Sequence, residues 1–500
     1  MSQHLPILPI LLPLAVALTL LIGRLRLRTR RGVAVVAVAV QLVVAVWLVA
    51  GSGQGLVMTY ALGDWAAPFG IVLVVDRLAA LMVAITAVLS ACCLLHSISL
   101  DRDRGLHFHP LFQFQVMGIQ GAFLTGDLFN LFVFFELLLI ASYALVTQGG
   151  TRPRLAAGFH YIVINLTGSS LFLIAVALIY NELGTLNMAH IADLIRTQQP
   201  GEFTLVPVAV ALLFLVFAIK AAVFPLGFWL PRAYAAAAAP VAGLFAVMTK
   251  VGVYALLRLY YLWLADLSLP WVARVTDALV VAGGLTLGIA TLGVLGSTRL
   301  RQLNSWSIVA GAGTLVMALG AGSAAPLSAV LYYMVHSTWL GAVGFLLADG
   351  LDWAGSSDRF DTEPSQPQPP HPLSLVFMVF AVAVAGLPPL SGFFGKLLLL
   401  QGTAQWVHQG WYWALVLASS LVVAVALARA GSRMFWTTAA PVQAPAPGWR
   451  LVPLGALVGA SVLWVMGADP VVQFLEATGT QIRDPDSMVR ALVPPVLEGS

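Results

Sequence analysis

Residues 205–258 read LVPVAVALLFLVFAIKAAVFPLGFWLPRAYAAAAAPVAGLFAVMTKVGVYALLR and place Lys220 and Lys250 inside two long apolar runs. The third and last lysine of the chain, Lys396, also lies inside an apolar run. A lysine at the centre of a membrane-spanning helix is roughly 15 Å from either end, farther than its side chain can comfortably reach. Placing it there costs about 2.5 to 3.5 kcal/mol, so such residues usually face a bundle interior and mark an ion or proton path. We therefore expect all three lysines to have a functional role inside a helical bundle.

The composition excludes an ordinary soluble domain. Of the 500 residues, 60% are hydrophobic and 9% are charged, with a mean hydropathy of +0.92, whereas a soluble domain has about a quarter charged residues. No broad basic surface suggests a nucleic-acid partner. The only cysteines, Cys92 and Cys93, are adjacent, which excludes a disulfide framework, a CxxC metal site and an iron–sulfur cluster. The sequence predicts an all-α polytopic membrane protein with no cofactor motif, and it leaves any metal ligands unknown.

Fourteen apolar runs, each about 20 residues long, predict fourteen transmembrane helices in one bundle. Their approximate ranges are 5–23, 32–50, 71–95, 110–126, 128–147, 158–180, 205–230, 240–264, 274–296, 303–321, 326–348, 373–400, 411–430 and 450–468. The first run is followed, not preceded, by a cluster of arginines from Arg24 to Arg31, which predicts a retained first helix with its N-terminus outside. With that orientation every inner loop carries arginine, whereas the four longer outer loops contain one, Arg196. Two polar, proline-rich stretches, 351–372 and 437–449, are expected to be loops.

Two of the predicted helices are interrupted by proline at membrane depth. Pro225 lies in the seventh run, and Pro388 and Pro389 lie in the twelfth. Such breaks are tolerated where the backbone lines a protein interior or a cavity. The two interrupted helices are five helices apart. Because five is an odd number, the second one crosses the membrane in the opposite direction to the first. Paired breaks of this kind indicate inverted repeats in transporters. We therefore expect an N-terminal three-helix segment at 1–109, broken helices 7 and 12 in two inverted five-helix repeats at 110–264 and 274–430, and a C-terminal helix and tail at 431–500.

Glu136 is the residue most expected to pair with one of these lysines. It lies in the run 128–147 with no other charged residue within a turn on either side. An ion pair in low dielectric costs less than either ion alone, so we predict that Glu136 pairs with Lys220. A protonated, neutral glutamate is the alternative. For Lys250 a proton-carrying role is expected, and a lysine that only locks two helices together is the alternative.

His336 and Lys396 extend this polar series into the second half of the chain. His336 lies near the middle of the eleventh run and is placed to relay a proton between Lys250 and Lys396, although a lone histidine bonded to a neighbouring helix is nearly as good an interpretation. His160 lies nearer a helix end, where an entry role and a plain helix-end role are evenly balanced. Asp76 and Asp127 lie near run ends and are expected to be solvated or to cap helices.

Three stretches of the chain resemble a known family: TGDLFNLFVFFELLLIASYALV (125–146), IKAAVFPLGFWLPRAYAAAAAPVAGLFAVMTKVGVYALLRL (219–259) and AGLPPLSGFFGK (385–396). This is the family shared by the antiporter-like subunits of respiratory complex I and the A and D subunits of Mrp-type multisubunit monovalent cation/proton antiporters. The residues of the first stretch and the chain length of 500 residues resemble the D subunit most. The resemblance implies a fourteen-helix fold with two inverted repeats. It also implies a proton path through five residues, namely Glu136, Lys220, Lys250, His336 and Lys396.

The chain departs from the family pattern at two places. Some members have a lysine four residues after the histidine, where this chain has Leu340, and the loop after Pro231 is poorer in proline than is common. Neither place touches Glu136 or Lys220.

Three functions are compatible with these residues. The first is a transporter subunit, not an enzyme: a proton-translocating subunit of a Na⁺/H⁺ or K⁺/H⁺ antiporter. It would work with other membrane subunits in a bacterial-type inner (plasma) membrane. The second is the equivalent proton-pumping subunit of a complex I or a membrane hydrogenase, in which other polypeptides transfer the electrons. The third, a quinone-binding redox enzyme in its own right, is disfavoured because the sequence has no cluster ligands or flavin motif.

Overall fold

The computed structural model describes residues 2–65, 70–197, 203–322, 326–361, 371–436 and 448–492. Residues 437–447 of the predicted loop at 437–449 and residues 362–370 of the predicted loop at 351–372 lie outside these residues. Residues 351–353 and 371–372 of the second predicted loop are helical instead. The first half of the chain contains η1 (Ser2–Ile7), α1 (Leu8–Ile22), α2 (Leu27–Ser52), β1 (Met58–Ala61), η2 (Leu62–Asp64), β2 (Val72–Val75), α3 (Arg77–Ser99), α4 (Phe108–Leu124), α5 (Leu128–Thr147), α6 (Arg152–Leu183), α7 (Met188–Thr197), α8 (Val206–Lys220), α9 (Trp229–Ala236), α10 (Ala239–Phe245), α11 (Met248–Leu259) and a π-helical turn, η3 (Tyr260–Leu264). The second half contains α12 (Pro270–Leu295), α13 (Leu300–Gly320), α14 (Leu327–Trp353), α15 (His371–Ala385), α16 (Ser391–Gly402), α17 (Gln409–Phe435), η5 (Gly448–Leu451), α18 (Val452–Met466), α19 (Ala468–Ile482) and α20 (Pro485–Leu492).

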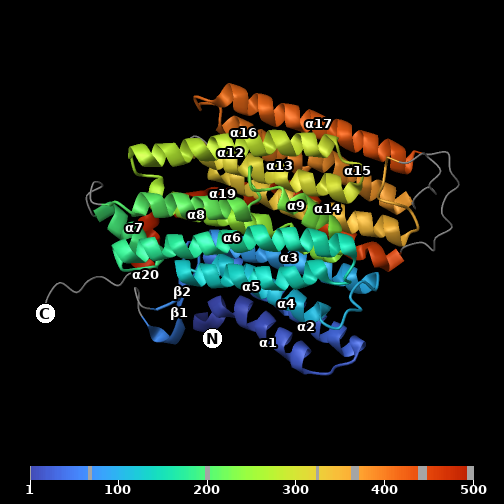
Figure 1. Cartoon of the computed structure of the whole chain (residues 1–500), viewed down its shortest axis with the longest axis horizontal. Coiled ribbons are helices and arrows are strands. Elements are labelled where there is room, and N and C mark those ends of the chain that lie inside the picture. The colour runs from blue at the N-terminus through green and yellow to red at the C-terminus, as the bar shows by residue number, and fades with distance from the viewer. Residues whose placement is uncertain are drawn as a thin grey trace.

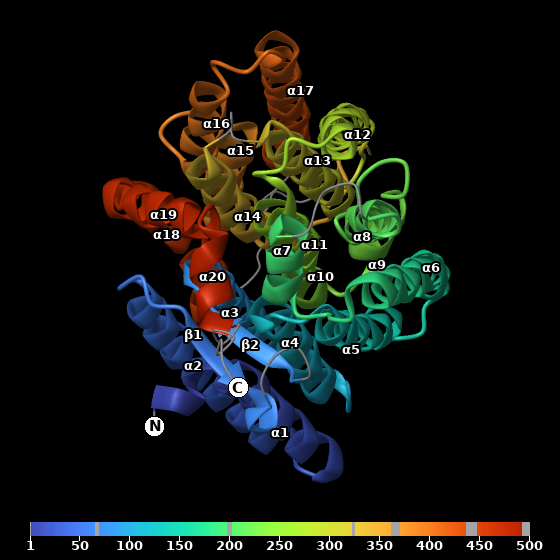
Figure 2. The same ribbon diagram turned by 90° about the vertical axis from the view of Figure 1, so that its left-hand side faces the viewer.

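The long helices lie side by side along one direction and form a bundle (Figure 1). Viewed along the helices, α10, α11 and α14 lie in the middle of the bundle, and α1, α6, α12 and α17 lie at its rim (Figure 2). The rim helices expose large apolar side chains, as at Leu21, Phe159, Leu292 and Leu421. An apolar rim around a buried centre is typical of a protein in a bilayer, because lipid chains can cover exposed apolar side chains without the free-energy cost that water would impose.

Eleven helices of the described residues are long and apolar enough to cross a membrane. Two further apolar helices, α8 and α15, are shorter, and α4 has 17 residues. The prediction of a helical polytopic membrane protein is therefore confirmed at this level. The predicted runs at 205–230 and 373–400 each contain two helices, because α8 ends at Lys220 before Pro225 and α15 ends at Ala385 before Pro388. A proline lacks the N–H that a continuing helix needs and forces the residue before it out of the helical region.

The segment before α3 corrects the prediction that a helix begins near residue 71. Val72–Val75 is instead a buried strand, paired antiparallel with Met58–Ala61, so that Met58 faces Val75 and Ala61 faces Val72. A run of four apolar residues cannot by its pattern distinguish a buried strand from a buried helix. The three β-branched valines favour the strand. Helix α3 begins only at Arg77, where the carboxylate of Asp76 accepts the Ala79 N–H at 2.8 Å and caps the helix.

The C-terminal region contains more helix than the sequence predicted. Beyond α18 the predicted tail forms α19 and α20, and α18 and α19 pack against α3 and α14. The end of the chain therefore returns to helices from the N-terminal and central parts, as the red ribbon beside α3 shows in Figure 2.

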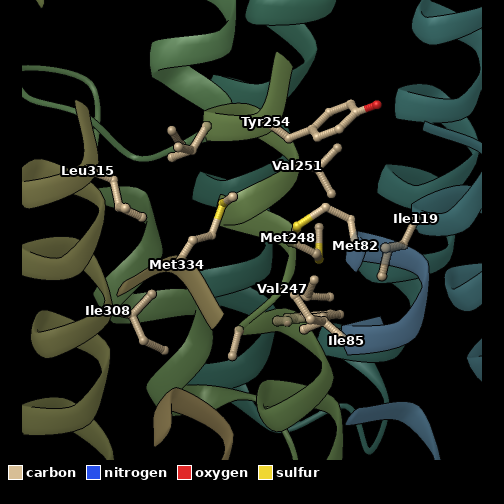
Figure 3. Close-up of a cluster of buried hydrophobic side chains, with 14 of the residues drawn as sticks. Met82, Ile85, Ile119, Val247, Met248, Val251, Tyr254, Ile308, Leu315 and Met334 are labelled. Atoms are coloured by element: carbon tan, nitrogen blue, oxygen red, sulfur yellow. The ribbon is translucent and has the colours of Figure 1, made fainter. Parts of the chain in front are cut away.

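The middle of the bundle is an apolar cluster in which α3, α4, α11, α13 and α14 meet (Figure 3). The side chains labelled there are Met82, Ile85, Ile119, Val247, Met248, Val251, Tyr254, Ile308, Leu315 and Met334. All of them are at least nine-tenths buried. Helix α11 carries Lys250 between Met248 and Val251, and all of its residues are buried.

Candidate functional site

Ser169 connects Glu136 and Lys220. The ammonium group of Lys220 donates to the Ser169 hydroxyl at 3.2 Å and to the Asn165 carbonyl at 3.2 Å. The Ser169 hydroxyl in turn donates to the Glu136 carboxylate. No ion pair joins Glu136 and Lys220 directly among the described residues, so the predicted direct pairing is corrected to a bridged one. A hydroxyl that accepts from one group and donates to the next forms a short hydrogen-bonded chain from α8 through α6 to α5.

The end of α8 explains how Lys220 is stabilised without a direct carboxylate contact. Lys220 is the last residue of α8, and it is only 4% exposed. A helix C-terminus carries partial negative charge from its unpaired carbonyls, which favours a cation in the last turn. The ring centroid of Phe135 also lies 5.8 Å from the Lys220 nitrogen and adds a cation–π contact. The break that Pro225 imposes on the helix therefore helps to create the lysine site.

Lys250 differs from the other two lysines because its ammonium group has no hydrogen-bond partner among the described residues. Its side chain is fully buried, and its ammonium nitrogen forms no hydrogen bond within the described part of the chain. Helix α11 approaches the end of α8 at Gly252, where a side-chain Cβ would lie 3.0 Å from the carbonyl carbon of Lys220, so only glycine allows this approach. An unpartnered cation in a dry core is costly, and such a group is retained where it has a function or where water reaches it.

Lys396 occupies a second helix end. It lies in α16, and its ammonium nitrogen donates to the carbonyls of Ala385 at 3.0 Å and Val384 at 3.4 Å, at the C-terminus of α15, and to the Ser420 hydroxyl at 2.8 Å. Gly386 makes room for it, because its φ is +80° and a Cβ there would lie 2.9 Å from the Lys396 nitrogen. Both Lys220 and Lys396 are therefore stabilised by the C-terminal end of a helix, α8 for Lys220 and α15 for Lys396.

His336 belongs to the same half of the site as Lys396. Its Nδ1 lies 2.8 Å from the Ser391 hydroxyl, which lies 2.8 Å from the Ser461 hydroxyl on α18. His336, Lys396 and Ser420 line one internal cavity of about 40 Å³. A water molecule needs roughly 10 to 15 Å³ of such space, so the cavity has room for about three waters between the imidazole and the ammonium group.

The other titratable residues considered in the sequence lie outside these two groups. Asp76 and Asp127 cap α3 and α5, as predicted, but both are buried instead of solvated, and Asp76 forms an ion pair with Arg258. His160 lines a separate cavity of about 960 Å³. No group of three or more metal-ligating side chains occurs in the described ranges.

The predicted path residues therefore fall into three places. The structure brings Glu136 and Lys220 together through Ser169. It brings His336 and Lys396 to one cavity, and it leaves Lys250 without a hydrogen bond to either group.

Sequence reasoning missed the hydroxyl groups that join the charged residues. Ser169, Ser391 and Ser420 lie in apolar helices, where serine most often packs as a small residue or bonds back to the carbonyl four residues earlier. Ser169 and Ser420 do form that backbone contact as well. One signal was present: Asn165 and Ser169 are four residues apart, so both lie on one face of α6 and face the end of α8.

Comparisons with family models and with known proteins all indicate the same protein family. The model of the family described as "NADH:quinone oxidoreductase/Mrp antiporter, TM" matches residues 125–424. A protein of Rhizobium meliloti, named as the D subunit of a probable K(+)/H(+) antiporter, is 39% identical over 97% of this chain and 96% of its own length. A protein of Alkalihalophilus pseudofirmus, named as the D subunit of a Na(+)/H(+) antiporter, is 34% identical over 98% of this chain and 99% of its own length.

Two solved structures share the fold over nearly the whole chain. A chain of the Mrp complex from Dietzia sp. DQ12-45-1b matches with a TM-score of 0.86 and 25% identity, covering 98% of this chain and 99% of that one. A chain of the membrane-bound sulfane sulfur reductase, an archaeal respiratory membrane complex, matches with a TM-score of 0.88 and 28% identity over the same shares. The chain therefore belongs to the NADH:quinone oxidoreductase/Mrp antiporter transmembrane family, and over its full length it is similar to proteins named as the D subunits of Na⁺/H⁺ and K⁺/H⁺ antiporters.

Proposed function

We propose that this chain is a proton-translocating membrane subunit of a multisubunit monovalent cation/proton antiporter, and that it is a transporter subunit, not an enzyme. The full-length similarity to proteins named as antiporter D subunits supports this function. The single observation that carries the proton-path part is that Lys250 is fully buried and unpartnered within the described residues, on the helix α11 that packs against α8. A lysine used only to lock two helices would have an acceptor on one of them.

The proposed path runs through five side chains that can each gain or lose a proton. They are Glu136, Lys220, Lys250, His336 and Lys396. Ser169 links the first two, and the internal cavity links the last two. The step between Lys220 and Lys250 and the step between Lys250 and His336 require water or side-chain movement, since Lys250 has no hydrogen bond in the described part of the chain.

The proposed topology has fourteen membrane crossings. It counts α8 with α9, α10 with α11, and α15 with α16 as single interrupted crossings, and it places inverted five-helix repeats at 110–264 and 274–430. The N-terminus is then outside, and the loops with Arg104, Arg152, Arg299 and Arg359 face the cytoplasm of a bacterial-type cell across its plasma membrane. In support, each repeat contains one helix that ends before a proline and has a lysine at the break.

The deciding experiment is exchange in vesicles that contain the whole membrane complex. The tagged chain is purified from cells together with its bound partners, and mass spectrometry identifies these partners. We expect several small membrane subunits, proton exchange for Na⁺ or K⁺, and loss of exchange in Glu136→Ala and Lys220→Ala at normal assembly. Vesicles that hold only this polypeptide are expected to be inactive, because no group of metal-ligating side chains that could hold a cation occurs in the described ranges. Exchange by the isolated chain would overturn the proposal.

A second candidate is a proton-pumping subunit of a redox-driven respiratory complex. The observation that favours it is the likeness to a chain of the sulfane sulfur reductase complex, which has a TM-score of 0.88. Recovery of flavin-containing and iron–sulfur subunits with the tagged chain would select this candidate, whereas their absence from an active, exchanging complex would select the antiporter.

A further inference from the structure

A large cavity opens at the end of the bundle that carries the arginine-rich loops. It has a volume of about 960 Å³ and lies between α6, α9, the start of α13 and the segment after α14. Four arginines and two aspartates are among its lining residues: Arg232, Arg299, Arg301, Arg359, Asp352 and Asp358. The positive side chains of the lining therefore outnumber the negative ones.

The positive charges of this cavity are unequally neutralised. Arg301 is bound by Asp352 at 2.6 Å, and Arg359 is bound by Asp361 at 2.9 Å. Arg232 and Arg299 are exposed and form no ion pair within the described part of the chain, and Arg299 lies close enough to Asp361 to help lower the pKa of that carboxyl. Two guanidinium groups thus line one cavity without an ion pair among the described residues, which suits a ligand that carries a phosphate.

A shallow apolar groove, with an enclosed volume of only about 10 Å³, adjoins this cavity. Its lining is Ala222, Phe224, Gly227, Phe228, Thr286, Ile289, Trp306 and Val309. Phe228 and Trp306 line both the cavity and the groove, and their ring centroids lie 6.3 Å apart. Phe228 is 47% exposed, and the outer face of α12 next to the groove exposes Leu285 and Leu292. The groove therefore opens toward the apolar rim and not toward the core.

We propose that the cavity and the groove together bind one anionic diacyl phospholipid. The phosphate group lies at Arg232 and Arg299, and one acyl chain lies along Phe224, Phe228 and Ile289. Basic pockets between transmembrane helices at the membrane surface recognise anionic headgroups, and aromatic side chains favour the boundary between headgroup and acyl chain. A free phosphate ion uses only the cavity, and the phosphate of a zwitterionic lipid gains less from Arg232 and Arg299, because these arginines repel the cationic group of its headgroup. The combination of both surfaces therefore favours an anionic lipid.

The test measures lipid binding and does not depend on transport. The assembled complex is purified in detergent, depleted of lipid, and mixed with phosphatidylglycerol or with phosphatidylcholine of the same acyl chains. Retained lipid is counted by native mass spectrometry, and the melting temperature is followed in parallel. We expect the wild-type complex to retain about tenfold more phosphatidylglycerol than phosphatidylcholine, since two basic contacts at the membrane surface are involved.

Three variants separate the parts of the site. The double variant Arg232→Gln with Arg299→Gln removes the unpaired charges, and Ile289→Trp fills the groove. Both are expected to lose the preference for phosphatidylglycerol. The matched control is Arg152→Gln, an exposed arginine of the same end that does not line the cavity, and it is expected to bind as the wild type does.

Four outcomes would overturn the proposal. The first two are equal retention of both lipids and undiminished binding by the double variant. The third is displacement of phosphatidylglycerol by inorganic phosphate together with unchanged binding in Ile289→Trp, since the site would then take a free anion. The fourth is a photocrosslink from position 228 to another polypeptide of the complex, since a protein partner and not a lipid would then cover the groove.

Discussion

Lys220 and Glu136 are connected by the hydroxyl of Ser169 and not by a direct ion pair. The Ser169 oxygen accepts from the Lys220 ammonium group at 3.2 Å and uses its single proton to donate to the carboxylate. A proton that leaves Lys220 for Glu136 can therefore pass through the hydroxyl by exchange along the hydrogen bonds. Ser169 becomes a residue whose removal distinguishes a path from a structural contact.

Ser169→Ala is expected to lower the exchange rate of the assembled complex by about tenfold. This is less than the roughly 10²- to 10⁴-fold contribution of a positioned proton-transfer group, because a water molecule can replace the hydroxyl in part. Ser170→Ala is the matched control, since Ser170 is exposed and bonds to the Leu166 carbonyl of its own helix. The measurement is exchange in vesicles at equal complex content. Equal rates for the two variants would remove Ser169 from the path.

Lys220→Arg is expected to give an assembled but inactive complex. Arginine keeps the positive charge at the C-terminus of α8, so a purely structural lysine would tolerate the change. A proton carrier would not, because the guanidinium group stays protonated in proteins. Assembly is checked first, by recovery of the intact complex in detergent, since the guanidinium group is larger than the ammonium group. Wild-type exchange by the assembled variant would show that Lys220 never releases its proton.

Lys250→Met is expected to abolish exchange while keeping or raising the melting temperature of the complex. The substitution removes a buried polar group that has no partner in the described residues and replaces it with an apolar chain of similar length. Lys220→Met is the comparison, because it removes the hydrogen bonds that Lys220 donates to the Asn165 carbonyl and the Ser169 hydroxyl. That loss is expected to cost about 1 to 3 kcal/mol. A strong drop in melting temperature for Lys250→Met would mean that Lys250 locks the helices.

Lys396→Ala is expected to remove most exchange, whereas His336→Ala is expected to leave a measurable fraction. The cavity of about 40 Å³ that both residues line allows water to bridge the position of a missing imidazole. Water cannot replace the charge that α15 stabilises with its last carbonyls. Rates of both variants in the same vesicles give the ranking. The opposite ranking would mean that the path ends before α16.

Asp103→Asn is expected to lower the stability of the complex at neutral pH. Burial raises the pKa of Asp103, but hydrogen bonds from His109 at 2.9 Å and Arg31 at 2.5 Å outweigh burial and hold the pKa at about 2. Because this pKa is below the unfolded value of about 4, the carboxylate stabilises the fold above about pH 4 and loses that effect as the pH falls toward 2. Melting temperatures measured from pH 7 down to pH 3 test this. Asp101→Asn, at a more exposed carboxylate that also binds Arg31, is the control and is expected to have a smaller effect.

The sequence alone determined the class of the protein and the residues of the candidate path. Its three lysines lie inside apolar runs. Because a charged side chain at that depth of a membrane is energetically costly, the sequence alone marks them as candidates for a functional role. Pro225 and Pro388 likewise predicted where helices end, since the missing N–H is a local property. The strand Val72–Val75 was not predictable in the same way, because an apolar run of four residues has no periodicity that separates strand from helix.

Only the tertiary structure decided how the charged residues are connected. Ser169 and Ser420 carry no signal of their own in the sequence, because serine in an apolar helix is more often a packing residue than a link. Their role depends on which helix ends face them, and that depends on contacts between segments far apart in the chain, as between Ser169 and Lys220. The same holds for Lys250: the sequence placed a cation at membrane depth, but the absence of an acceptor around it within the described residues is a property of the packed bundle. Local composition fixes the energetic cost of a buried charge, and only the packing of neighbouring helices fixes what compensates it.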